Sequence, residues 1–153
     1  MVWKPHVTVA ALTERDGRYL VVEEDVRGKR VFNNPAGHLE PGESFIDAVR
    51  RETLEETGWE FQPDAVTGIY LWKNPEVDAT FLRVAFHGRC LRHHPDRKLD
   101  RGIVAPHWLT RAELAGGEFQ LRTPLVLRCI DDLLAGRRYP LEILSHIPEP
   151  EIA

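Results

Sequence analysis

The feature that most constrains this chain of 153 residues is a strongly marked helix over residues 44–57. Ser44, with Asp47 three residues later, resembles a capping box at its start. Gly58 supplies a stop signal directly after its last residue. Because these signals are all local, we expect the helix to form, and the other elements must pack around it.

Three glutamates share one side of this helix. At about 100° per residue, Glu55 and Glu56 fall within about 60° of Glu52, and Val49 of the apolar stripe lies on the same side. Like charges at this spacing repel each other, and partial burial raises the cost unless a counter-charge is present. A divalent cation with oxygen ligands, Mg²⁺ above all, meets that need. The alternative is a solvated acidic face that two neighbouring arginines balance.

The net charge of the chain is −4, and all of it falls in residues 37–59, which hold six acids and two bases. Such a chain is not expected to coat a nucleic acid. It also has no apolar run near the roughly 18 residues that span a bilayer, and no signal-peptide pattern at its start. Cys90 and Cys129 give no disulfide framework, so a cytoplasmic location is expected. We therefore expect a small-molecule substrate, and a monomer or weak dimer that binds neither nucleic-acid polymer nor membrane.

The other segments alternate between strands and helices. We expect strands over 6–12, 18–23, 66–73, 80–86 and 103–109, a short capped helix from 110, a main helix over 124–135 and an extended segment over 138–141. The first two strands are typical of a hairpin, and residues 33–37 are expected to be irregular because Pro35 and Gly37 interrupt them. With no repeat and no linker, this indicates a single α/β domain over residues 1–153 with a mixed sheet.

The spacing of fixed residues around the helix resembles the Nudix box, GX5EX7REUXEEXGU, in which U is a bulky apolar residue. The fixed positions are occupied by Gly37, Glu43, Arg51, Glu52, Glu55, Glu56 and Gly58 within residues 37–59. Thr53 and Trp59, at the two U positions, depart from the pattern only in packing. The resemblance implies the Nudix fold, a mixed β-sheet sandwiched between α-helices. It also implies hydrolysis of a diphosphate joined to another group, assisted by Mg²⁺ or alternatively Mn²⁺.

The resemblance also implies a set of metal ligands. Glu52, Glu55 and Glu56 look like the metal-binding carboxylates, and the Ala36 carbonyl would complete the ligand shell. Glu43 looks like an outer-shell residue or a ligand of a second metal. Bound metal would neutralise phosphate oxygens and lower the pKa of bound water.

Three catalytic residues follow from the same pattern. Arg51 resembles the arginine that aims the Glu52 carboxylate, and either Glu52 or Glu55 would orient or deprotonate the attacking water. Many Nudix enzymes supply a further acid from the loop before a late tryptophan, but the expected spacing falls on a glycine here. The nearest acids are Asp100 and Asp96, and an ordinary loop charge is the better explanation for each.

The resemblance extends beyond the box to segments that are similar to one bacterial phosphatase branch of the family. They are residues 4–10, 20–24, 33–40, 81–83, 123–126 and 138–142. This implies action on nucleoside tri- and diphosphates and on hydroxymethylpyrimidine pyrophosphate, with release of orthophosphate. Two alternatives stay open. One is a Nudix pyrophosphatase of nucleotide sugars or oxidised nucleotides, and the other is a Nudix-fold binding or regulatory module without turnover.

A substrate with a flat ring and a diphosphate needs aromatic and cationic contacts. The aromatic candidates are Trp3, Phe32, Trp72 and Phe81, although core packing explains each of them individually. The candidate phosphate contacts are Lys29, Arg83, His38 and His6, and for the histidines a structural role is an equal alternative.

Overall fold

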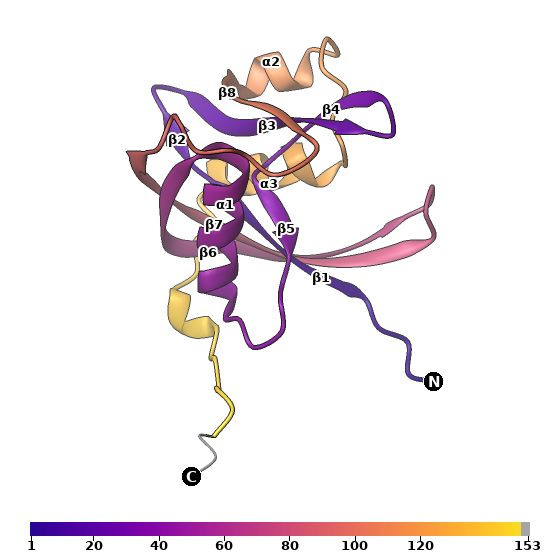
Figure 1. The fold of residues 1–153 in the computed structure, drawn as a ribbon, viewed down its shortest axis with the longest axis vertical. Helices are drawn as coiled ribbons and strands as arrows, with labels where there is room; N and C mark the ends of the chain where they lie inside the picture. Colours follow the sequence, from indigo (N-terminus) through magenta and orange to yellow (C-terminus); the bar gives the residue numbers. More distant parts are fainter. Residues whose placement is uncertain (151–153) are drawn as a thin grey trace.

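Two four-stranded sheets form the framework of the computed structural model, which describes residues 1–150 and so leaves the last three residues of the expected domain outside. The first sheet has the order β5-β1-β7-β6. In it β1 (His6–Leu12) runs parallel to β7 (Ala79–His93) and antiparallel to β5 (Ala36–His38). A long antiparallel ribbon joins β6 (Trp59–Asn74) to β7, and its turn end extends away from the rest of the molecule (Figure 1).

The second sheet is antiparallel and is organised around β3 (Arg18–Val26). β3 pairs with the short β2 (Glu14–Arg15), with β4 (Lys29–Asn33) and with β8 (Ile103–Thr110). The segment between β4 and β5 therefore crosses from the second sheet to the first.

Four helical segments complete the chain: α1 (Phe45–Thr57), α2 (Arg111–Ala115), α3 (Leu125–Leu134) and the single 3₁₀ turn η1 (Leu141–Ile143). α1 packs on one face of the first sheet (Figure 1). On the other face, α3 and strands of the second sheet share a core with the first sheet. None of the helices within residues 1–150 is long and apolar enough to cross a membrane.

The sequence of β1 explains this layering. Successive side chains of a strand point to opposite faces, and in β1 both sets are apolar. Val9 and Ala11 pack in the cluster with α1, while Ala10 and Leu12 pack in the cluster with α3, and none of the four is more than 1% exposed. A strand that is buried on both faces belongs in a covered sheet. The expected fold class, a mixed sheet between helices, is confirmed.

Two local predictions were wrong. The first two expected strands do not form a hairpin, because β1 stays in the first sheet and only the two-residue β2 turns back onto β3, with Glu14 opposite Tyr19 and Arg15 opposite Arg18. Residues 33–37 are not irregular throughout, since Asn33 ends β4 and Ala36 starts β5. Long-range pairing explains both differences. β1 pairs with β7, and residues 36–38 pair with β1, which the local turn signals could not predict.

The other predicted elements are present. The helices expected at 44–57, 110 onward and 124–135 correspond to α1, α2 and α3, and the strand at 103–109 corresponds to β8. The two strands at 66–73 and 80–86 are longer than expected, because their antiparallel pairing continues in both directions along β6 and β7.

Candidate active site

Helix α1 is fixed at both ends, which sets the direction of its carboxylates. The Ser44 hydroxyl accepts a hydrogen bond from the Asp47 N–H at 3.0 Å. At the other end Gly58 adopts φ 76°, a left-handed conformation that favours glycine, and its N–H donates to the Leu54 carbonyl at 2.9 Å. Between these caps Glu52 and Glu56 are buried and Glu55 is half-buried. The predicted overlap of the glutamates with the buried side of the helix is confirmed.

Gly37 makes room for the Glu52 carboxylate. Strand β5 passes so close to α1 that a Cβ at position 37 would lie 2.1 Å from Cδ of Glu52 and 2.2–2.3 Å from its two oxygens. A side chain there would have to push the Glu52 carboxylate aside, so glycine at this position leaves that carboxylate in its place.

Arg51 joins the acids of the site together. Its Nη1 donates to Oε1 of Glu52 at 2.9 Å and to Oε2 of Glu55 at 3.1 Å. Its Nε and Nη2 donate to the two carboxylate oxygens of Glu43 at 2.6 and 3.0 Å, and Nη2 also donates to the His38 carbonyl at 3.0 Å. The Arg51–Glu52 contact that the sequence suggested is therefore present. Hydrogen bonding by Arg51 lowers the pKa of Glu43, which is held as a carboxylate beside the site.

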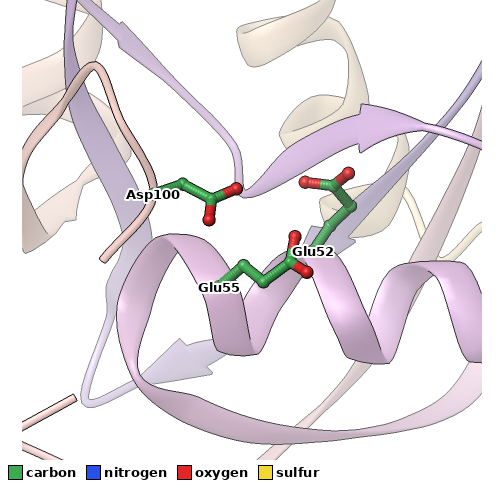
Figure 2. Close-up of side chains that lie close together, drawn as sticks. All are labelled: Glu52, Glu55 and Asp100. Atoms are coloured by element: carbon green, nitrogen blue, oxygen red, sulfur yellow. The ribbon is translucent and has the colours of Figure 1, made fainter. Parts of the chain in front are cut away.

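Asp100 completes a three-carboxylate cluster. One oxygen each of Glu52, Glu55 and Asp100 lies within 4.8 Å of the other two. In Figure 2 both glutamates project from α1, and Asp100 approaches from the loop before β8. The Asp100 N–H donates to the Glu55 carbonyl at 2.9 Å, which fixes this loop against the helix. Asp100 does lie in a loop, as expected, and a catalytic role for it stays a prediction. Its closeness to Glu52 and Glu55 was not predicted, since no local sequence pattern records that contact.

Glu56 has different partners from the cluster. Its Oε1 accepts a hydrogen bond from the Ala36 N–H at 2.8 Å, and the residue is 8% exposed. Burial raises its pKa well above the ordinary value of 4.5, and the Ala36 hydrogen bond only partly opposes this. Glu56 therefore ties α1 to the start of β5, which is the segment whose Ala36 carbonyl the sequence proposed as a metal ligand.

The carboxylate cluster carries more negative charge than the single Arg51 guanidinium balances. Burial raises the pKa of Glu52 from 4.5 to about 7, although the Arg51 hydrogen bond and charge act in the opposite direction. The charges of Glu55 and Asp100 raise it further. The pKa of Glu55 is also raised, by burial and then by Asp100. A group of oxygen donors held together against this cost fits a hard divalent cation.

Four of the predicted substrate residues lie together in an aromatic row that crosses the four strands of the first sheet and consists of His38, His6, Phe81 and Trp72. His6 lies opposite Phe81, which lies opposite Trp72. The His6 and Phe81 rings stack with centroids 5.0 Å apart, and the Phe81 and Trp72 rings with centroids 6.2 Å apart. Nδ1 of His6 and Nε2 of His38 are hydrogen-bonded at 3.1 Å. The His38 end of the row adjoins the carboxylate site, because the backbone carbonyl of His38 accepts a hydrogen bond from Arg51.

The other predicted contacts lie elsewhere. Phe32 packs in the core against Phe119, and Trp3 is 67% exposed in the segment before β1. Lys29 is exposed at the turn between β3 and β4. Arg83 is buried, and its guanidinium donates to the side-chain carbonyls of the two asparagines at positions 33 and 34. A substrate role for each of these four stays a prediction.

Comparison with known proteins agrees with this geometry. Residues 3–128 match the family model of the NUDIX domain. Phosphatase NudJ of Escherichia coli (strain K12) is 38% identical over 149 residues, which cover 97% of this chain and 96% of the relative. A solved NUDIX hydrolase from Nitrosomonas europaea is 52% identical with a TM-score of 0.91, covering 94% of this chain and 98% of that one. The MutT protein from Methanosarcina mazei Go1, at 22% identity and a TM-score of 0.69 over 90% and 99% of the two chains, shows the fold alone. The chain belongs to the Nudix family and is a hydrolase of phosphoric anhydrides.

Proposed function

We propose that this hydrolase is a Mg²⁺-dependent phosphatase of nucleoside tri- and diphosphates and of ring diphosphates such as hydroxymethylpyrimidine pyrophosphate, from which it releases orthophosphate. The observation that carries the proposal is the cluster of Glu52, Glu55 and Asp100, in which Arg51 holds the two glutamates. The similarity to phosphatase NudJ over nearly the whole chain supports the substrate class and the release of phosphate.

The donor set fits Mg²⁺, with Mn²⁺ as the alternative. Every candidate ligand is an oxygen, and burial opposes the uncompensated charge of Glu52. Glu52, Glu55 and Asp100 would hold the ion, with Glu56 and the Ala36 carbonyl as the ligands that the family pattern adds. When bound, the ion would neutralise phosphate oxygens and lower the pKa of a bound water.

The side chains of the chain itself have separate tasks. Arg51 holds Oε1 of Glu52 and Oε2 of Glu55, so the second oxygen of each carboxylate is left for a ligand or a proton. Either Glu52 or Glu55 would orient or deprotonate the attacking water, through a carboxylate oxygen that neither Arg51 nor the ion holds. Glu43 acts outside the ligand shell, because both of its oxygens bind Arg51.

The aromatic row is proposed to stack the ring of the substrate. Its rings lie side by side across the strands of the first sheet, and Trp72 and Phe81 are only half-buried. An aromatic face accepts either a base or a pyrimidine, which matches a broad substrate range. His38, next to Arg51, is placed where the ring and the phosphates meet.

A phosphate-release screen tests the proposed function. ADP, hydroxymethylpyrimidine pyrophosphate and a nucleotide sugar would be incubated with the protein, with and without Mg²⁺. Orthophosphate from the first two substrates only, and only with Mg²⁺, is the expected result. Release of a nucleoside monophosphate together with a second phosphorylated product would instead indicate the nucleotide-sugar pyrophosphatase.

Two variants test the metal-site residues in the same assay. Glu55→Gln and Glu56→Gln should each lose metal-dependent turnover and remain folded, while the exposed Glu60→Gln should keep full turnover. Survival of turnover in both site variants would refute the assignment of these ligands.

The same proposal includes a cytoplasmic location and a monomer or weak dimer. Both cysteines are free thiols buried in the protein, Cys90 on β7 and Cys129 on α3, which suits a reducing compartment. Light scattering over a range of protein concentrations would measure the oligomeric state.

A further inference from the structure

Arg83 is a buried cation that has no task in the proposed function. It lies on β7, an inner strand of the first sheet, and is 4% exposed. The structure gives its guanidinium no carboxylate partner within residues 1–150. Burying a charge without an opposite charge costs free energy, and an apolar side chain would fill the same place at a lower cost. The presence of this charge is therefore explained by the hydrogen bonds that it makes.

Those hydrogen bonds hold two consecutive side chains. Nη1 of Arg83 donates to Oδ1 of Asn34 at 3.0 Å, and Nη2 donates to Oδ1 of Asn33 at 3.2 Å. Both asparagines are buried, and they lie where β4 ends and the chain crosses to the first sheet. Nδ2 of Asn34 has no hydrogen-bond partner in the described part of the chain, so Arg83 is what holds this amide. The planar guanidinium thus fixes the start of the crossing segment.

The crossing segment leads directly into the candidate metal site. Ala36, two residues after Asn34, starts β5, and its N–H donates to Oε1 of Glu56 at 2.8 Å. The carbonyl of Pro35, between them, accepts a hydrogen bond at 2.9 Å from the backbone of β1. The segment is therefore held by Arg83 where it begins, and by β1 and α1 where it ends.

We propose that Arg83 is a positioning residue for the metal site. By holding Asn33 and Asn34 it fixes the path of the chain into β5, and so sets where Ala36 meets Glu56. The inference rests on the proposed function in one respect, because it takes Glu56 and the Ala36 carbonyl as metal ligands. The alternative role of Arg83, contact with a substrate phosphate, would need an accessible guanidinium, and this one is buried with both Nη atoms hydrogen-bonded.

Mg²⁺ binding without substrate separates these two roles. Arg83→Met removes the guanidinium and leaves a long apolar side chain in its place. If Arg83 positions the metal site, the affinity for Mg²⁺ measured by calorimetry should fall about 10- to 100-fold. If Arg83 instead contacts a phosphate, the variant should bind Mg²⁺ as the wild type does and show a raised KM for the diphosphate. That second result would overturn the proposal.

A double variant tests whether Arg83 acts through the asparagines. Asn34→Ala should also weaken Mg²⁺ binding, because it removes one of the two amides that the guanidinium holds. Arg83→Met/Asn34→Ala should bind Mg²⁺ no more weakly than Arg83→Met alone, since the same contact is lost in both. Independent losses that multiply in the double variant would overturn the proposal. If Arg83→Met does not fold, Asn34→Ala decides alone, and wild-type Mg²⁺ affinity in that variant would overturn the proposal.

Tyr70→Phe is the matched control for a general loss of stability. Tyr70 lies opposite Arg83 on the neighbouring strand β6, and its hydroxyl donates a buried hydrogen bond to Asp132 at 2.8 Å. The change removes that bond and leaves the crossing segment untouched, so it should lower the melting temperature without changing Mg²⁺ affinity. If Tyr70→Phe weakens Mg²⁺ binding as much as Arg83→Met does, lost stability explains both variants and the proposal fails.

Hydrogen exchange in EDTA, followed by NMR, tests the positioning without metal or substrate. The Ala36 N–H, which is bonded to Glu56, should exchange about 10-fold faster in Arg83→Met and in Asn34→Ala, and at the wild-type rate in Tyr70→Phe. A wild-type exchange rate in the first two variants would overturn the proposal. If the wild-type protein binds no divalent cation, the proposed function fails, and the exchange rates still decide whether Arg83 holds this segment.

Discussion

Replacing Glu52 by glutamine should stabilise the metal-free protein at high pH while removing a central ligand of its site. Glutamine has nearly the same shape and its carbonyl can still accept the Arg51 hydrogen bond, but it carries no charge. Burial raises the pKa of Glu52 from 4.5 to about 7, and Glu52 has only 12% of its side chain exposed. Since one pKa step is worth about 1.4 kcal/mol, keeping this carboxylate ionised in the folded protein costs about 3 kcal/mol.

The pH window follows from the direction of this pKa shift. Between pH 4.5 and about 7 the folded wild-type protein binds a proton at Glu52 that the unfolded chain has released. The free energy of unfolding of the wild type therefore falls as pH rises through this window, and that of Glu52→Gln does not share this fall. We expect the variant to be more stable by about 3 kcal/mol at pH 8 and no more stable below pH 4.5.

Urea denaturation in EDTA, at pH 4 and pH 8, measures this difference. Glu43→Gln is the matched comparison, because Arg51 hydrogen bonding lowers the pKa of Glu43. Its loss should destabilise the protein above pH 4.5, and that effect should vanish as pH falls through the lowered pKa. Adding Mg²⁺ at 100 times its Kd should stabilise the wild type by about 2.7 kcal/mol and Glu52→Gln by much less. A Glu52→Gln variant that gains nothing at pH 8, or gains equally at pH 4, would refute this reasoning.

Two further perturbations test how the site is held. Gly37→Ala should leave the fold intact, as measured by circular dichroism, since the new Cβ meets only the flexible end of Glu52. Because that carboxylate must move, kcat should fall by about 100-fold. An unchanged kcat would show that the close approach has no catalytic importance. Asp100→Asn should weaken Mg²⁺ binding roughly 10- to 100-fold, as measured by calorimetry. The control is Asp96→Asn, which changes a loop acid outside the cluster and should leave Mg²⁺ affinity unchanged. Equal Mg²⁺ affinities in the two variants would show that Asp100 is not part of the metal site.

Helix α1 and most of its chemistry could be predicted from the sequence because the signals involved are local. The Ser44 cap and the Gly58 stop need only a few neighbouring residues, and the helical period fixes which glutamates share a side. The contact between Arg51 and Glu55 is a neighbour relation on one helix turn, at the spacing i, i+4.

The features that sequence reasoning missed all depend on pairing between distant segments. β1 lies between β5 and β7, so both of its edges are paired and it does not form the expected hairpin with the strand that follows it. Asp100 reaches Glu55 through one backbone hydrogen bond from a loop, and Arg122 reaches Glu24 across the second sheet. Arg83, a predicted phosphate contact, is buried, and its guanidinium donates to the side chains of Asn33 and Asn34 from a distant part of the chain. Spacing rules describe neighbours along one element, and these contacts join different ones.

The charge balance of the site predicts an order of binding. Arg51 lies within 3.4 Å of oxygens of four acids, Glu40, Glu43, Glu52 and Glu55, and Asp100 adds a fifth negative charge. One guanidinium cannot balance this set, so a diphosphate that enters the metal-free site meets net repulsion. We expect a non-hydrolysable ADP analogue to bind at least 10-fold more tightly with Mg²⁺ than in EDTA, as measured by calorimetry. In Glu52→Gln the affinity in EDTA should rise, because one repelling charge is gone. Equal affinity of the wild-type protein with and without Mg²⁺ would mean that its own arginines, and not the metal, hold the phosphates.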